Sequence, residues 1–162
     1  MRTRPQLFVA LALLLAACSG MADPLTLREK RDLVNARALW YSSPVRNSYR
    51  YELRLSCFCP TELTQWNRIT VIDGVVVDVQ TEQGAAVSRD RWSSYATVDR
   101  LFATLEADGD SELEDITARF DPQYGYPVEM NFFYSPEIQD AGASYFARNL
   151  QAVARAGGSG QD

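Results

Sequence analysis

The chain has 162 residues, which is enough for one domain or at most two very small ones. Hydrophobic residues make up 46% of it and charged residues 23%, proportions that exclude a collagen-like or largely disordered protein. Histidine is absent, and 16 basic against 21 acidic residues give a formal net charge of −5. These values exclude histidine-based catalytic triads and histidine metal sites, and they argue against a nucleic-acid-binding protein.

Residues 1–17 are predicted to be a signal peptide for export. Arg2 and Arg4 give the segment a positive start, and residues 7–15 form an unbroken apolar run. This run is much shorter than the roughly 20 residues that a membrane-spanning helix needs. Ala16 and Ala17 then supply the small residues of a cleavage region. The segment is therefore interpreted as a cleaved signal and not as a transmembrane anchor.

Cys18 directly follows this segment, and the sequence Leu15-Ala16-Ala17-Cys18 fits a bacterial lipobox. The motif predicts cleavage before Cys18, a diacylglyceryl group on its thiol and an acyl chain such as palmitate on the new amino terminus. The alternative is an ordinary signal peptide with an incidental cysteine. With lipidation, residues 18–25 form the anchor and a tether that reaches at most roughly 25 Å. The protein would then be anchored to the bacterial membrane, at the periplasmic face of the outer membrane in a Gram-negative cell.

Residues 26–155 are predicted to form a single domain, followed by a flexible tail over residues 156–162. Thr26 and Glu29 have the spacing of a capping box, which predicts a helix from there to about Tyr41. Apolar and polar residues then alternate from 49 to 59, which predicts a half-buried strand that ends at a proline.

The next elements follow from turn and cap signals. Asp73-Gly74 lies between two β-branched runs, which predicts a two-residue type I′ hairpin. Thr97 is a predicted N-cap, because apolar residues recur after it at helical spacing. Strands are predicted at 116–120 and 128–134, and residues 144–150 fit either a last strand or a short helix. The expected fold class is α+β, with two helices packed on an antiparallel sheet in the order α-β-β-β-α-β-β-β.

Several short motifs along residues 36–150 resemble those of one known family. They are, in chain order, Ala38-Leu39-Trp40, Tyr49-x-Tyr51, Cys57-Phe58-Cys59-Pro60, Asp73-Gly74, Thr97-Val98-Asp99-x-Leu101-Phe102 and Phe120-Asp121-Pro122-x-x-Gly125-Tyr126-Pro127. The resemblance is to small bacterial lipoproteins catalogued as a domain of unknown function, DUF6174. It implies lipidation and the α+β order, but it implies no activity and no catalytic residue.

Cys57 and Cys59 are the first candidate site. Residues two apart on a strand have Cα atoms about 6.5–7 Å apart, so a disulfide between them needs a local bend. Export to an oxidising compartment favours that bond. The alternatives are two buried thiols or a redox-active dithiol, although the sequence shows nothing near them that would lower the pKa of a thiol.

An acidic run extends from Glu106 to Asp115, and within it Asp108, Asp110 and Glu112 have the spacing of a calcium-binding loop. Leu113 occupies the position at which such a loop needs glycine for its sharp turn. A solvated linker is therefore expected instead of a metal site. No catalytic residue, metal or cofactor is predicted anywhere in the chain.

Aromatic and basic residues form the candidate partner-binding site, because exposed Trp, Tyr and Arg often anchor interfaces. They are Arg89, Arg91, Trp92, Tyr124 and Tyr126. The alternative is that Trp92 and Tyr95 close one end of the core.

We therefore expect a membrane-anchored envelope lipoprotein. Its domain is expected to have a binding or structural role and not to be an enzyme. Its partners would be the membrane, through the lipid, and an envelope protein or cell-wall ligand, with no nucleic acid. The alternative function is thiol–disulfide exchange by the Cys57-x-Cys59 pair.

Overall fold

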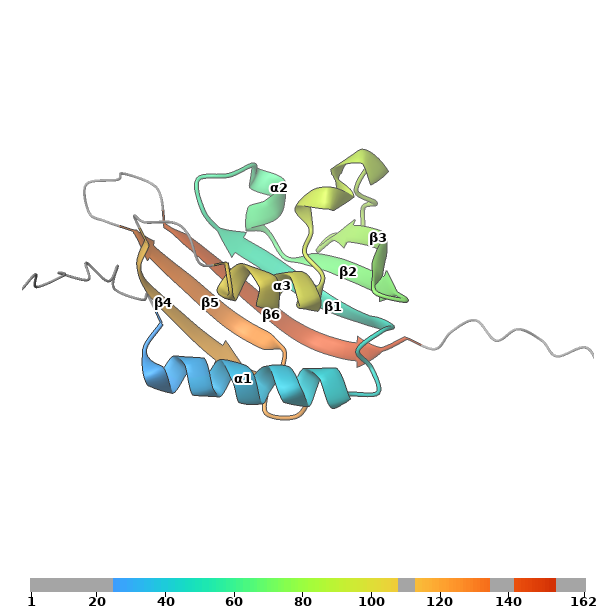
Figure 1. Ribbon diagram of the computed structural model, residues 1–162. Helices are drawn as coiled ribbons and strands as arrows, with labels where there is room; N and C mark the ends of the chain where they lie inside the picture. The colour runs from blue at the N-terminus through green and yellow to red at the C-terminus, as the bar shows by residue number, and fades with distance from the viewer. Residues whose placement is uncertain (1–24, 108–112, 135–141, 154–162) are drawn as a thin grey trace, which may run out of the picture.

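A single antiparallel sheet dominates the computed structural model, which describes residues 25–107, 113–134 and 142–153 (Figure 1). In these ranges six strands pair in the order β3-β2-β1-β6-β5-β4. They are β1 (Tyr49–Ser56), β2 (Asn67–Ile72), β3 (Val75–Thr81), β4 (Leu113–Phe120), β5 (Pro127–Tyr134) and β6 (Ala143–Ala152). Strands β1 to β3 and strands β4 to β6 each form a meander, and the pairing of β1 with β6 joins the two.

Two helices of different length lie on one side of this sheet, α1 (Leu27–Ser42) and α3 (Val98–Leu105) (Figure 1). The predicted capping box starts α1, since the Thr26 hydroxyl accepts from the Glu29 N–H and the Glu29 carboxylate accepts from the Thr26 N–H. Thr97 caps α3 in the predicted way, by accepting from the N–H of Arg100.

The expected α+β fold, with its order α-β-β-β-α-β-β-β, is wrong. The described chain is strand-rich, and its helical segments are mostly short. The four-residue α2 (Thr61–Thr64) and the 3-10 helix η1 (Arg89–Ser94) interrupt the expected order, and α3 has only eight residues. Neither α2 nor η1 has a buried residue, so these two segments carry no apolar periodicity by which the sequence would reveal them. Residues 144–150, which fitted strand or helix, belong to β6.

The hairpin between β2 and β3 is the strongest local prediction, and it is confirmed. Asp73 and Gly74 both have positive φ, at 50° and 78°, as a type I′ turn requires. The strand predicted over residues 49–59 is shorter than expected, because β1 ends at Ser56 and the chain bends through residues 57–59.

The alternation along β1 separates the two faces of the sheet. Tyr49, Tyr51 and Leu53 are buried in the core that the sheet forms with α1 and α3. Arg50 and Glu52 alternate with them and therefore lie on the opposite side, here called the open face. The core thus fixes which side chains of β1 remain available to solvent.

Two buried tyrosine hydroxyls position the start of α3. The Tyr49 hydroxyl oxygen accepts from the N–H of Val98 at 2.8 Å, and the Tyr51 hydroxyl donates to the Ala96 carbonyl. Burial raises the pKa of Tyr49 and that of Tyr51 above the ordinary tyrosine value. Both side chains therefore stay neutral and able to bind the backbone.

We predict that Tyr49→Phe lowers the free energy of unfolding by about 1–3 kcal/mol, because the buried N–H of Val98 loses its acceptor. The raised folded pKa means that the stabilising contribution is complete below the unfolded pKa of about 10 and is lost as pH rises further. The Tyr49→Phe variant should therefore lose less stability than the parent above that pH.

Urea unfolding at pH 7 and at alkaline pH measures both effects. Tyr41→Phe is the matched control, because Tyr41 is exposed. Equal stability of the Tyr49→Phe variant and the parent at both values would contradict the assignment.

Candidate functional site

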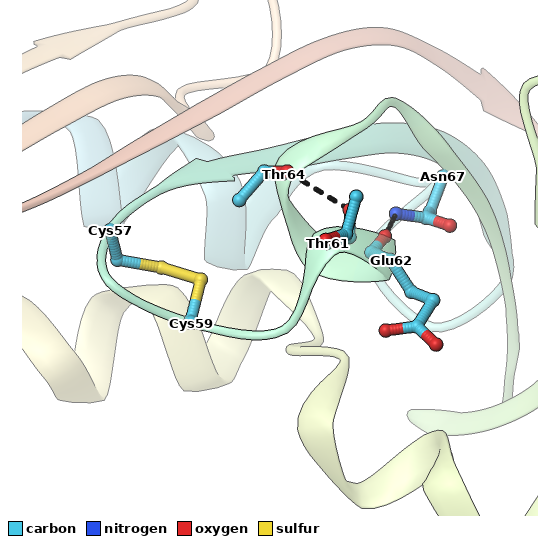
Figure 2. The surroundings of a disulfide bond; sticks show 6 residues. All are labelled: Cys57, Cys59, Thr61, Glu62, Thr64 and Asn67. Atoms are coloured by element: carbon cyan, nitrogen blue, oxygen red, sulfur yellow. Dashed lines mark hydrogen bonds between the residues drawn. A yellow bond between two sulfur atoms is a disulfide. The ribbon is translucent and has the colours of Figure 1, made fainter.

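Cys57 and Cys59 form a disulfide in the loop after β1 (Figure 2). Because the strand has ended at Ser56 and the chain bends here, the two Cα atoms lie 5.3 Å apart, closer than on a regular strand. Phe58 between them is 89% exposed. The loop therefore presents one aromatic side chain to solvent.

The short helix α2 holds the other end of this loop (Figure 2). The buried Asn67 amide donates to the carbonyls of Glu62 at 2.7 Å and Gln65 at 2.9 Å. The Glu62 carboxylate also pairs with Arg91 of η1 at 2.9 Å, and this hydrogen bond lowers the pKa of Glu62. These contacts connect the disulfide loop to β2 and η1.

The predicted partner residues Arg89, Arg91 and Trp92 lie on η1, next to the edge strand β3. The Trp92 indole N–H donates to the carbonyl of Val87 at 3.0 Å, and its ring packs against the core. Tyr95 is buried. This placement favours the alternative, that Trp92 and Tyr95 close the core, while both arginines remain exposed.

The other predicted residues, Tyr124 and Tyr126, lie in the turn between β4 and β5. Tyr126 is only 5% exposed, and Tyr124 is half-buried. The sheet order places this turn near one edge of the sheet and η1 at the other edge. The structure therefore does not bring the five predicted residues together as one site.

A different cluster, not predicted from the sequence, lies on the open face at the middle of the sheet. The Arg54 guanidinium lies 4.7 Å from the ring centroid of Phe146 and 5.3 Å from that of Trp66. Arg148 lies 3.8 Å from the Trp66 centroid. Cation–π contacts at these distances hold the guanidinium groups in place.

Glu52 connects this cluster to β6. Its Oε2 accepts from Arg148 Nε at 2.7 Å and from Asn149 Nδ2 at 3.1 Å. Beside it, Arg50 Nη2 donates to Gln151 Oε1 at 3.3 Å. The carboxylate of Glu52 is therefore turned toward β6 and already has a cationic partner.

A bulge in β6 brings these partners to the same face. The register with β1 shifts between Arg50 and Glu52, and Asn149 has a φ of 57°. A bulge adds a residue and changes the direction of the side chains around it. Arg148, Asn149 and Gln151 are consequently all exposed, while Leu150 between them is buried.

An open pocket of about 230 Å³ lies between these side chains and β2. Here it is called the β1–β6 pocket, and it is lined by Arg50, Tyr51, Glu52, Arg68, Asn149 and Gln151. A cavity of about 50 Å³ shares Glu52 and Arg68 with it and reaches Trp66 and Arg148. Arg68 therefore lines both the β1–β6 pocket and the smaller cavity beside Trp66 and Arg148.

A larger groove, of about 540 Å³, lies between α1 and β4. Its charged groups already have partners nearby, since Arg28 lies 3.8 Å from Asp32 and Arg119 donates to Glu129 at 2.6 and 2.9 Å. This pairing lowers the pKa of Glu129. We therefore take the β1–β6 pocket as the candidate site.

Several predictions lie outside the described residues, among them Cys18, the signal segment and Asp108, Asp110 and Glu112 of the acidic run. In the part of the chain that the structure describes, no three His, Cys, Asp or Glu side chains gather so that they could hold a metal ion. No helix in those same ranges is long and apolar enough to cross a membrane.

A family model described as Family of unknown function (DUF6174) matches residues 32–152, from within α1 to the end of β6. The chain belongs to this family. The resemblance to DUF6174 seen in the sequence motifs is therefore confirmed. No curated protein and no solved structure matches the chain.

The β4–β5 turn of this DUF6174 domain gives a test of the fold around α1. Gly125 has a φ of +79°, and a Cβ there would collide with the carbonyl oxygen of Ala36 and lie 3.0 Å from the backbone nitrogen of Trp40. We predict that Gly125→Ala lowers the free energy of unfolding by roughly 3 kcal/mol, from backbone strain and the clash together.

Gly84→Ala is the matched control, because Gly84 has a φ of +83° with nothing within 4 Å of the added Cβ. Gly84→Ala should lower the free energy of unfolding by about 1 kcal/mol, from the strain of the left-handed conformation alone. Thermal and urea unfolding measure both variants. Equal losses at the two positions would show that the turn does not pack on α1 in this way.

Proposed function

We propose that the protein is a lipid-anchored component of the bacterial envelope whose DUF6174 domain binds a ligand and performs no catalysis. The observation that carries the anchoring is the apolar run of residues 7–15 followed by Ala16, Ala17 and Cys18. Lipidation of Cys18 would place more than one acyl chain on one residue, which gives much firmer anchoring than a single chain.

The tether supports a position close to the membrane. Helix α1 begins at Leu27, and the seven residues between Cys18 and Thr26 reach at most roughly 25 Å when extended. The domain would therefore work near the surface of its own membrane.

The Cys57–Cys59 disulfide supports export, because disulfides persist mainly in oxidising compartments. The alternative of thiol–disulfide exchange by this pair stays a prediction. Nothing in the residues that the structure describes favours it over a structural bond.

The β1–β6 pocket supports a binding role. Its charged side chains are two arginines and a glutamate that is already paired with a third arginine. A guanidinium remains protonated at all ordinary pH values, so arginine binds and orients anionic groups but is poorly suited to proton transfer. The residue types of the pocket are therefore those of a binding site.

We predict that the chain made in growing bacteria incorporates labelled palmitate and begins at Cys18. Intact-mass measurement should show loss of residues 1–17, the added lipid mass, and a mass two hydrogens below that of free thiols at Cys57 and Cys59. Cys18→Ser should abolish the label and release the protein from membranes, because the acceptor thiol is gone.

The control is the double variant Cys57→Ser with Cys59→Ser, which removes the other two thiols and should retain the label. A mature chain that begins at another residue, or a Cys18→Ser variant that keeps its palmitate, would contradict the proposed anchoring.

A further inference from the structure

We propose that the β1–β6 pocket binds an acidic sugar, that is, a hydroxyl-bearing ring with one carboxylate or phosphate group. The oxyanion would be held by Arg50 and Arg68, and the hydroxyl groups by the neighbouring amides and by Glu52. This inference rests on the binding role proposed above and names the class of ligand.

Arg68 is the first observation. It lies directly opposite Glu52 in the β1–β2 register, a position at which pairing of a carboxylate with an arginine would stabilise the sheet. The Oε2 of Glu52 instead accepts hydrogen bonds from Arg148 and Asn149. Among the described residues Arg68 has no ion-pair partner, although it lines both cavities of the open face. Its charge is therefore available to a ligand in the β1–β6 pocket, whereas Glu82 lines only the smaller cavity.

Arg50 supplies a second cation in the same pocket as Arg68. In the register it opposes Thr70, so it is the diagonal neighbour of Arg68 across β1 and β2. Diagonal positions are about 7–8 Å apart, with their Cβ atoms somewhat closer, which lets two long side chains converge on one group. Arg50 uses Nη2 for its bond to Gln151, and its other N–H groups remain for a ligand.

The charge of the pocket contrasts with that of the whole chain. The chain has a net charge of −5, whereas the pocket has two arginines and a glutamate that Arg148 neutralises. Two like charges at diagonal positions repel one another, and an oxyanion between them relieves the repulsion. A planar guanidinium matches the geometry of a carboxylate or a phosphate equally well.

The remaining wall of the pocket fits hydroxyl groups. Asn149 and Gln151 have amide groups that both donate and accept, and Glu52 has a second carboxylate oxygen that can accept. The volume of about 230 Å³ is below that of pockets for drug-sized ligands, which begin at about 300 Å³. A single polar ring fits this size and lining better than an acyl chain or an aromatic group.

The bulge fixes this arrangement before a ligand arrives. Asn149 adopts the left-handed backbone conformation at the bulge, which asparagine tolerates better than most residues that carry a side chain. Trp66 and Glu52 hold Arg148 from two directions. These contacts hold Glu52 and the β6 side of the pocket in place, so the loss of side-chain freedom on binding is reduced on that side.

Calorimetric titration of the purified full-length chain tests the proposal. The probes are glucuronate and glucose 6-phosphate, with glucose as the uncharged control. We expect saturable binding of at least one acidic probe, with a dissociation constant of about 10 mM or tighter. Glucose should bind at least tenfold more weakly, and the comparison of the two acids shows whether a carboxylate or a phosphate is preferred.

Arg68→Ala should weaken binding of the acid at least tenfold. Arg31→Ala is the matched control, because it removes the same charge from an exposed position on α1 and should change binding less than twofold. Asn149→Gly keeps the left-handed backbone and removes the amide, and it should also weaken binding. Unfolding curves for each variant separate loss of the ligand contact from loss of the fold.

The proposal is overturned if neither acid binds, if glucose binds as well as the acids, or if Arg68→Ala remains folded and binds normally. These results are independent of the palmitate experiment. Loss of anchoring with intact acid binding would overturn only the membrane assignment, and correct anchoring without acid binding would overturn only the pocket assignment.

Discussion

The pairing of β1 with β6 is the interaction on which the rest of the structure depends. It connects two meanders that share no other neighbouring strands in the sheet of the described residues. The same pairing places residues almost a hundred positions apart in direct contact, as Glu52 with Arg148 shows. If β6 were shifted by one residue, its outward side chains would turn into the core. Fold and candidate site therefore depend on one register.

The two faces of the paired strands β1 and β6 have different roles. Toward the helices, β1 contributes Tyr49 and Tyr51, whose buried hydroxyls position the start of α3. Toward solvent, it contributes Arg50 and Glu52, which line a pocket together with residues of the β6 bulge. A rigid core behind a polar face holds a binding site in a fixed geometry, because side chains on a strand are positioned more precisely than side chains on a loop.

Sequence could predict what short stretches of chain decide by themselves. The Thr26–Glu29 capping box and the Asp73-Gly74 hairpin are of this kind, and both are confirmed. The candidate site could not be predicted in this way, because its residues come from β1, β2 and β6. Only the strand register brings Arg68 next to Glu52. The predicted interface residues have the chemistry of an interface, but Tyr126 is buried and the two groups lie apart in the sheet.

Binding of an oxyanion in the β1–β6 pocket is tested most directly through the side-chain Nε–Hε signals of arginine in the nitrogen-15-labelled full-length chain while glucose 6-phosphate is added. We expect saturable shifts of Arg50 and Arg68, smaller shifts of Arg148 through Glu52, and no shift of Arg31 on α1. Shifts confined to Arg28 and Arg119 of the α1–β4 groove, or spread evenly over the arginines, would contradict it.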